Sequence, residues 1–246
     1  MPDLRSQAAE RRSRAPRRRQ QEIRDAAAVV FHEKGYESTS IQDIADSVGI
    51  LKGSLYYYIT SKEDLLFEII QDVHETARKN LRLSQPDEGD ALQRIRAFVV
   101  AHFTHNAANL VKVAVFFQDF RSLSGERRRT IVEERDLYEN SLRDLIRVGQ
   151  AERIVCPDID PKLAAITVLG MMNWIYQWYR PSGEHSAADI ADSYADFVVA
   201  GLACDASTHQ PGHRRNLAPL PFELAPSPTD GAAALRAARE GKATVG

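Results

Sequence analysis

The feature that most constrains this chain is the stretch of residues 38–63, whose residues predict two short helices joined by a glycine turn. Ser40 can accept a backbone N–H of the first helical turn, and Asp43, three residues later, can bond back to it. The apolar residues that follow are spaced i, i+3, i+4 and i+7, which places Ile41, Ile44, Ala45 and Val48 on one helix face. Gly49 then ends the helix, because glycine adopts a left-handed cap without steric cost.

A second helix is predicted from about Lys52 to Tyr58, with Leu55 and Ile59 facing inward. The residues left outward near its start are Lys52, Gly53, Ser54 and Tyr57. In helix-turn-helix proteins this half of the second helix enters the major groove of DNA. Lysine and serine can bond base edges or phosphates there, and glycine lets the backbone approach closely. Such helix pairs also occur in bundles without a nucleic-acid role, so spacing alone leaves a purely structural interpretation open.

Three linked motifs between residues 17 and 70 make the pattern more specific. They are Phe31-His32-Glu33-Lys34-Gly35-Tyr36, then Thr39-Ser40 with Ile41-Gln42-Asp43-Ile44-Ala45, and finally Gly53-Ser54-Leu55-Tyr56-Tyr57-Tyr58 with Ser61-Lys62-Glu63. Together they resemble the N-terminal domain of the TetR family of bacterial one-component repressors. The chain departs from the family pattern at Tyr58, where histidine is usual, and at Ile59, where phenylalanine is usual.

The resemblance implies an all-α fold, in which an N-terminal three-helix helix-turn-helix domain is joined to a larger helical ligand-binding and dimerisation domain. It also implies a homodimer that binds a double-stranded DNA operator and leaves it when a small-molecule effector binds. The residues expected at DNA are Thr39, Ser40, Lys52, Gly53, Ser54, Tyr56, Tyr57, Tyr58 and Lys62. Among these, we expect Lys52, Ser54 and Tyr57 to approach base edges, and Thr39, Ser40, Tyr56 and Lys62 to hold phosphates.

Charge and composition divide the chain into a basic flexible arm (1–16), the helix-turn-helix domain (17–62), a helical body (63–203) and a flexible proline-rich tail (204–246). The net charge of −2 excludes a uniformly basic DNA-binding protein, so positive charge must be local. Residues 1–19 carry seven arginines against two acidic residues. The arm could follow the DNA backbone or enter a minor groove, and a solvated, disordered tail is the alternative.

Membrane and secretory functions are not expected. The arginine-rich start is not followed by an apolar segment, as a secretory signal would be. The longest apolar stretch, Leu163 to Tyr179, is short for a membrane span and contains Asn173 and Gln177. Two cysteines offer no disulfide framework, which fits the reducing cytoplasm.

The same apolar stretch predicts a dimer. Asp160-Pro161 is a typical helix start, and the helix that would run from there to Tyr179 is apolar nearly all round. Such a helix needs cover on more than one side. The resemblance implies that this helix and the last one form a four-helix interface with a second subunit, whereas burial within a monomer is the alternative.

An effector pocket is expected where large apolar residues alternate with isolated polar ones, in residues 116–121 and 172–180. The candidate ligand-binding residues are Phe117, Gln118, Arg121, Trp174, Gln177 and Trp178. The last three share one helix face, so core packing or a dimer interface would explain them equally. Residues 173–181 also resemble the penultimate helix of a TetR subgroup of catabolic repressors that often senses acyl-coenzyme A, although that subgroup often has a basic residue where Gln177 stands.

An enzyme is the main alternative class. His102 and His105 share a helix face, but no carboxylate or cysteine nearby completes a metal site. No phosphate-binding glycine loop, nucleophile elbow or zinc signature is present in the sequence. We therefore expect no catalysis, no cofactor and no metal, with a helical interaction module that lacks DNA binding as a further alternative.

Overall fold

The computed structural model describes the backbone of residues 4–84 and 89–204, and the side chains of residues 18–82 and 89–204. The described elements are α1 (Leu4–Lys34), α2 (Ile41–Ser47), α3 (Lys52–Leu55), α4 (Lys62–Ser84), α5 (Ala91–Ala108), α6 (Leu110–Asp119), a short 3-10 helix η1 (Phe120–Ser122), α7 (Gly125–Ala151), α8 (Pro161–Asn173), α9 (Ile175–Trp178) and α10 (Ala187–Leu202). The nearest approach to a sheet within these residues is one isolated bridge between Val155 and Ala203. The predicted all-α fold is confirmed.

The N-terminal domain (α1–α3) forms as its sequence signals predict. Ser40 and Asp43 make a reciprocal capping box at the start of α2, which satisfies backbone N–H groups that no helical bond can satisfy. Gly35 follows α1 with a φ of 80°, and Gly49 follows α2 with a φ of 65°. Residues other than glycine adopt this left-handed backbone conformation only with strain.

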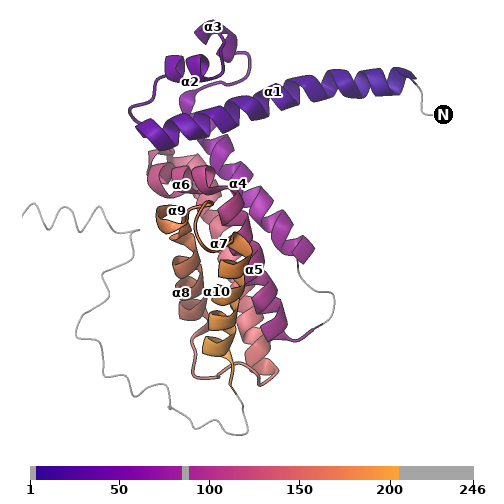
Figure 1. The fold of residues 1–246 in the computed structure, drawn as a ribbon, viewed down its shortest axis with the longest axis vertical. Coiled ribbons are helices and arrows are strands. Elements are labelled where there is room, and N and C mark those ends of the chain that lie inside the picture. The colour runs from indigo at the N-terminus through magenta and orange to yellow at the C-terminus, as the bar shows by residue number, and fades with distance from the viewer. Residues whose placement is uncertain (1–3, 85–88, 205–246) are drawn as a thin grey trace, which may run out of the picture. The chain divides into compact units, whose positions relative to one another are not determined.

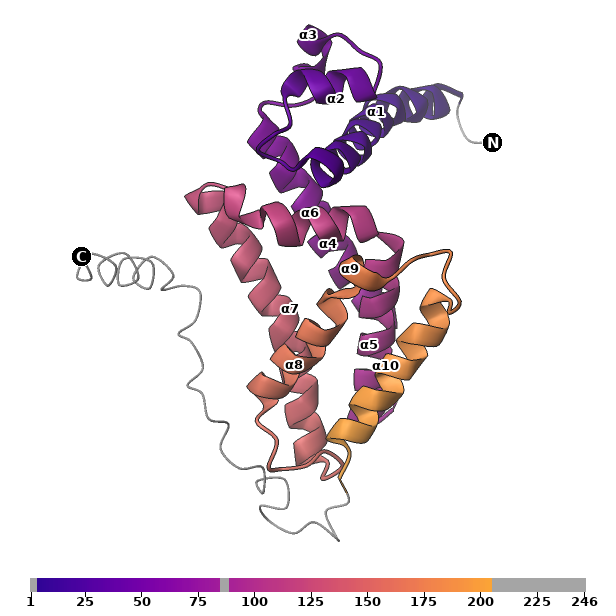
Figure 2. The same ribbon diagram turned by 60° about the vertical axis from the view of Figure 1, so that its left-hand side comes forward.

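The helical body (α4–α10) lies beyond this domain. Figures 1 and 2 show α5, α7, α8 and α10 running side by side, with α6 crossing between their upper ends and the N-terminal helices. Helix α4 leaves the N-terminal domain and runs down along α5, which also packs against α7 and α10. The described residues all belong to one compact unit.

The N-terminal domain and the body share one hydrophobic core. Its buried residues include Ile23, Phe31 and Leu55 of the N-terminal domain, but also Val115 and Phe116 of α6. An ion pair crosses this junction, because the ammonium of Lys112 on α6 lies 2.8 Å from Asp25 of α1; it also lies 2.9 Å from Asp72 of α4. Within the body, Arg127 of α7 pairs with Glu63 and Asp64 at the start of α4.

Besides the end of α3, two helix boundaries differ from the prediction. Helix α1 begins at Leu4 rather than Arg17, because residues 4–16 consist mainly of strong helix formers; the flexible arm was predicted from charge alone. The long apolar helix is interrupted at Trp174, which lets Ile175 and Tyr179 pack against Phe103 in a third core cluster. The predicted tail lies outside the described residues from position 205 onward.

Candidate nucleic-acid interface and ligand cavity

Helix α3 presents polar and aromatic groups on a surface that the rest of the domain does not cover. Leu55 is fully buried, and Ile59 is nearly so, which fixes the orientation of the helix. Lys52 and Gly53 are exposed, and the side chain of Tyr57 is 88% exposed. The helix is one turn shorter than predicted, since residues 56–58 form a turn, but the inward and outward faces are those expected from the sequence.

The remaining expected DNA-binding residues of this segment differ in exposure. Tyr56 is half-exposed, so its hydroxyl is available to a partner. Ser54 is only partly exposed. Tyr58, which replaces the usual histidine, packs against the shared core, and this gives it a structural role.

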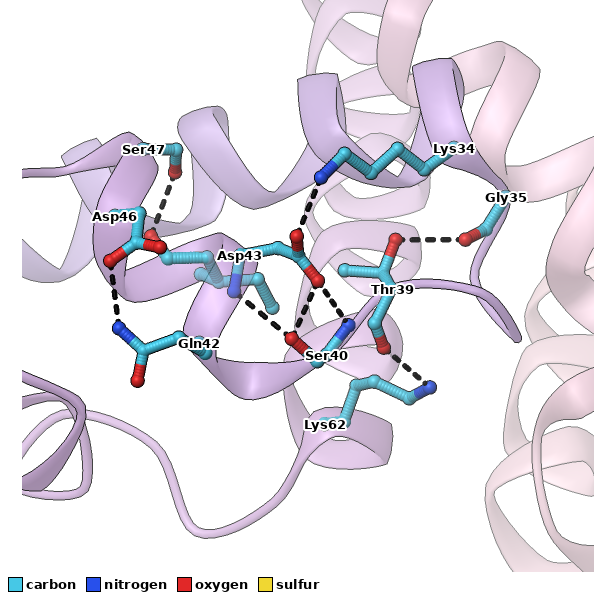
Figure 3. A network of polar contacts seen from close by, with 10 residues as sticks. Lys34, Gly35, Thr39, Ser40, Gln42, Asp43, Asp46, Ser47 and Lys62 are labelled. Atoms are coloured by element: carbon cyan, nitrogen blue, oxygen red, sulfur yellow. Dashed lines mark hydrogen bonds and ion pairs between the residues drawn. The ribbon is translucent and has the colours of Figure 1, made fainter.

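Ser40 is committed to capping α2. Its hydroxyl donates to Asp43 Oδ2 and accepts the backbone N–H of Asp43 at 3.1 Å (Figure 3). Bonds from the Lys34 ammonium and from Ser40 hold the pKa of the Asp43 carboxyl well below its usual range. Asp43 therefore stays negative at physiological pH, so a phosphate brought to the Ser40 side chain would meet a carboxylate.

Thr39 and Lys62 are also engaged within the protein, contrary to the expectation that their side chains are free to hold phosphates. Thr39 is buried, and its hydroxyl donates to the Gly35 carbonyl at 2.8 Å. The Lys62 ammonium donates to the carbonyls of Tyr36 and Thr39, each at 2.9 Å, and lies 4.3 Å from the centre of the Tyr36 ring. Figure 3 shows Lys62 reaching from α4 to the loop that precedes α2. Lys62 thus fastens this loop to α4.

A cavity of about 290 Å³ lies inside the helical body. Five helices line it: α4, α5, α6, α7 and α8. The lining residues are Val73, His74, Ala77, His102, His105, Asn106, Val113, Phe116, Phe117, Arg135, Tyr138, Glu139, Ile166, Leu169, Gly170 and Asn173. Its walls are mostly apolar with a few polar groups, which is the usual character of a small-molecule site.

Most of the candidate ligand-binding residues lie outside this cavity. Phe117 alone among the candidates lines the cavity. Gln118, Arg121 and Gln177 are exposed, and Trp174 and Trp178 are exposed aromatic residues next to the helix interruption. Arg135, which the prediction missed, is a cationic residue at the cavity.

A polar network occupies one wall of the cavity. His102 Nε2 lies 2.9 Å from Asn173 Oδ1, and His102 Nδ1 lies 3.0 Å from the Tyr138 hydroxyl. The Asn106 amide nitrogen lies 3.1 Å from His102 Nε2. Because a neutral histidine is a donor at one ring nitrogen and an acceptor at the other, it can bond to both Asn173 and Tyr138.

Burial keeps these groups uncharged at neutral pH. It lowers the pKa of both His102 and His74 to about 4, and it raises the pKa of Tyr138 above its usual value. His74 stacks edge-on against Phe116 with ring centres 4.8 Å apart. The polar wall therefore offers hydrogen bonds without a net charge.

One sequence signal could have revealed this wall. His102, His105 and Asn106 are spaced i, i+3 and i+4 on one face of α5, and all three are buried. The two histidines were considered only as metal ligands. Within the described part of the chain no three His, Cys, Asp or Glu side chains come together in a group that could hold a metal ion.

A second feature of the body is an apolar surface on α8, α9 and α10. The exposed large residues here are Leu163, Ile166, Trp174, Trp178 and Phe197. Helix α8 also packs against α7, and α10 packs against α5. This surface is where the predicted second subunit would pack. None of the helices in the described ranges is both long enough and apolar enough to cross a lipid bilayer.

Comparison with known proteins identifies the family. Residues 23–69 match the family model for bacterial regulatory proteins of the tetR family, and residues 88–202 match the model for the tetracyclin repressor-like C-terminal domain. The chain is 30% identical over 187 residues to the HTH-type transcriptional repressor KstR2 of Rhodococcus jostii (strain RHA1), a match that covers 75% of this chain and 91% of that protein. The chain belongs to the TetR family.

Solved structures of TetR regulators agree with this assignment. PfmR from Thermus thermophilus is 34% identical with a TM-score of 0.67, and the match covers 72% of this chain and 97% of PfmR. AibR, in a complex with isovaleryl coenzyme A and operator DNA, is 28% identical with a TM-score of 0.66, over 75% of this chain and 97% of AibR. These relatives are regulators, which favours a regulator over an enzyme.

Proposed function

We propose that this protein is a homodimeric transcriptional repressor that binds an operator through α3 and leaves it when a small molecule fills the cavity. The observation that carries the proposal is the exposed face of α3 in a chain of the TetR family. Lys52 projects from α3, whose opposite side is held by the buried Leu55, and Tyr57 projects from the turn that follows the helix. Lysine can bond guanine or phosphate, and tyrosine can donate to phosphate.

Dimerisation follows from the apolar surface on α8, α9 and α10. Large apolar side chains that remain exposed on these helices, such as Trp174 and Phe197, suit an interface with another protein chain. A twofold dimer would place two copies of α3 at a fixed separation. Two half-sites one DNA turn apart, roughly 34 Å, are the usual target of such a pair.

The proposed effector is an acyl-coenzyme A thioester or another apolar carboxylate derivative. A volume of about 290 Å³ holds roughly ten water-sized groups of about 30 Å³ each. The acyl part of a thioester fits this space, whereas its nucleotide would have to lie outside. Arg135 lines the cavity and Arg121 does not, so Arg135 is the cation that we propose for the polar end of such a ligand.

Phe116 contacts both the cavity and the packing that supports the DNA-binding domain. Its side chain lines the cavity and also belongs to the core that α6 shares with the N-terminal domain. A ligand that displaces Phe116 would therefore disturb the packing beneath α1. Only a ligand that binds the two states of the protein with different affinity can release DNA in this way.

The competing functions are a helical enzyme and an interaction module without DNA binding. A mobility-shift titration of the full chain with DNA from upstream of its own gene separates them from a repressor. The proposal requires a specific complex whose affinity falls steeply as salt increases, because phosphate contacts release counterions. Absence of any specific complex at low salt would reject the repressor assignment.

The effector class is tested separately. Thermal unfolding is measured with coenzyme A thioesters of increasing acyl length, with coenzyme A alone as the control. A bound thioester at 100 times its dissociation constant should add about 2.7 kcal/mol to the free energy of unfolding. It should also release the operator. The proposed effector class would be contradicted if coenzyme A alone stabilised the protein, or if no thioester of any acyl length did. Either result would leave the proposed DNA binding unaffected.

A further inference from the structure

Among the residues whose side chains the structure describes, Leu51 is the most exposed large apolar residue apart from Tyr57. Its side chain is 79% exposed. The neighbouring apolar residues are used in packing, since Ile50 lies against the shared core and Leu55 is fully buried within it. The fold therefore gains little from a leucine at this position.

The local backbone would also favour a different residue. Leu51 is the N-cap of α3, with φ −68° and ψ 144°, and it makes no side-chain capping bond. Serine, threonine, aspartate or asparagine at an N-cap stabilises a helix relative to an apolar residue, because its side chain accepts a free backbone N–H. An exposed leucine thus departs from two local preferences at once. Departures of this kind are expected where a residue serves function.

The described protein offers Leu51 no partner site of its own. Leu51 does not line the cavity. The exposed apolar surface that would form the dimer interface belongs to α8, α9 and α10. Both ribbon views show α3 away from these helices, at the top of the described part of the molecule (Figures 1 and 2). The two residues that follow Leu51, Lys52 and Gly53, are exposed as well.

We infer that Leu51 contacts the C5-methyl group of a thymine in each operator half-site, an inference that rests on the proposed DNA-binding function. The start of the second helix of a helix-turn-helix unit meets base edges in the major groove. The apolar group displayed there is the thymine methyl, and a small or apolar side chain is its usual partner. Lys52 can bond to base acceptors beside it, so the two side chains distinguish bases by different chemistry.

The test uses operators that differ by single methyl groups. An operator is first selected from a random-sequence pool with the full chain. Each thymine is then replaced in turn by deoxyuridine, which lacks only the C5-methyl, and binding is measured for the unaltered protein and for Leu51→Ala. One methyl-sized contact is worth about 0.8 kcal/mol, which is about fourfold in affinity.

We expect one thymine per half-site at which deoxyuridine weakens binding of the unaltered protein about fourfold but leaves binding of Leu51→Ala unchanged. Leu137→Ala is the matched control, because Leu137 is 61% exposed on α7, and it should respond to deoxyuridine as the unaltered protein does. Equal responses of the unaltered protein and Leu51→Ala at every thymine would overturn the inference. Failure to select any operator would instead reject the proposed function.

Discussion

Lys62 provides the sharpest test of the structure, because sequence and structure assign it different roles. The sequence pattern predicts a phosphate contact. In the structure its ammonium is bonded to the carbonyls of Tyr36 and Thr39 and lies over the Tyr36 ring. Lys62→Met keeps most of the length of the side chain and removes the ammonium group with its charge.

The size of the effect follows from these contacts. Hydrogen bonds that involve a charged group contribute about 1.5 to 3 kcal/mol, and the partial exposure of Lys62 favours the lower part of that range. We expect Lys62→Met to lower the free energy of unfolding by about 2 kcal/mol. For a chain of this size that corresponds to a fall of roughly 4 to 8 °C in the melting temperature.

Lys52→Met is the matched control for thermal stability, since Lys52 is exposed and its ammonium bonds to no other group in the described part of the chain. The salt dependence of operator binding separates the two roles. Loss of one phosphate contact reduces the slope of log affinity against log salt by about 0.9. Lys62→Met should leave that slope unchanged while lowering affinity and thermal stability. An unchanged melting temperature together with a reduced slope would refute the structural role of Lys62.

Three further predictions follow from the described contacts. Gly53→Ala should leave thermal stability unchanged or slightly higher, because no atom lies within 4 Å of the added Cβ. It should nevertheless weaken operator binding about fivefold or more, because the added methyl group holds the backbone away from DNA. In the control variant Gly125→Ala, the added Cβ would meet only the end of the Arg129 side chain at 4.0 Å, so operator affinity should stay unchanged in the same titration. The pKa of about 4 for His102 lies below the value of about 6.5 in an unfolded chain, so the unfolded state takes up protons first and the free energy of unfolding falls as pH drops from about 6.5 towards 4. In denaturant titrations, His102→Gln should remove roughly 2 kcal/mol of the decrease in this free energy between pH 7 and pH 5. An unaltered decrease would contradict the assignment of His102 as buried and neutral. Lys112→Met should lower the free energy of unfolding by about 1 kcal/mol, since it leaves two carboxylates on α1 and α4 without their shared cation, and a titration that gives no change would show that this ion pair does not stabilise the junction.

The N-terminal domain was predictable because its signals are local. The capping box of Ser40 and Asp43 and the turn at Gly49 each depend on residues within a few positions of one another. The inward positions Leu55 and Ile59 follow from helical spacing. What these signals do not give is the internal bonding of Lys62, whose partners lie 23 to 26 positions earlier in the chain.

The cavity was less predictable because five helices contribute to it. Periodicity shows that Trp174 and Trp178 share a face, but it does not show which element, if any, that face meets. The outward position of the two tryptophans depends on the helix interruption at Trp174. That interruption is explained by the burial of Ile175 and Tyr179 against Phe103, and the sequence does not show that Phe103 lies beside them. The polar wall of His102, Tyr138 and Asn173 likewise joins residues 36 and 71 positions apart.

The core that α6 shares with the first three helices limits how freely this chain could exchange parts with its relatives. A chimera that took residues 1–62 from another regulator would set a foreign surface against Val115 and Phe116, whose shapes suit the present neighbours. Modular grafting of operator specificity would therefore succeed only if the contacting residues of α6 were transplanted together with the donor segment.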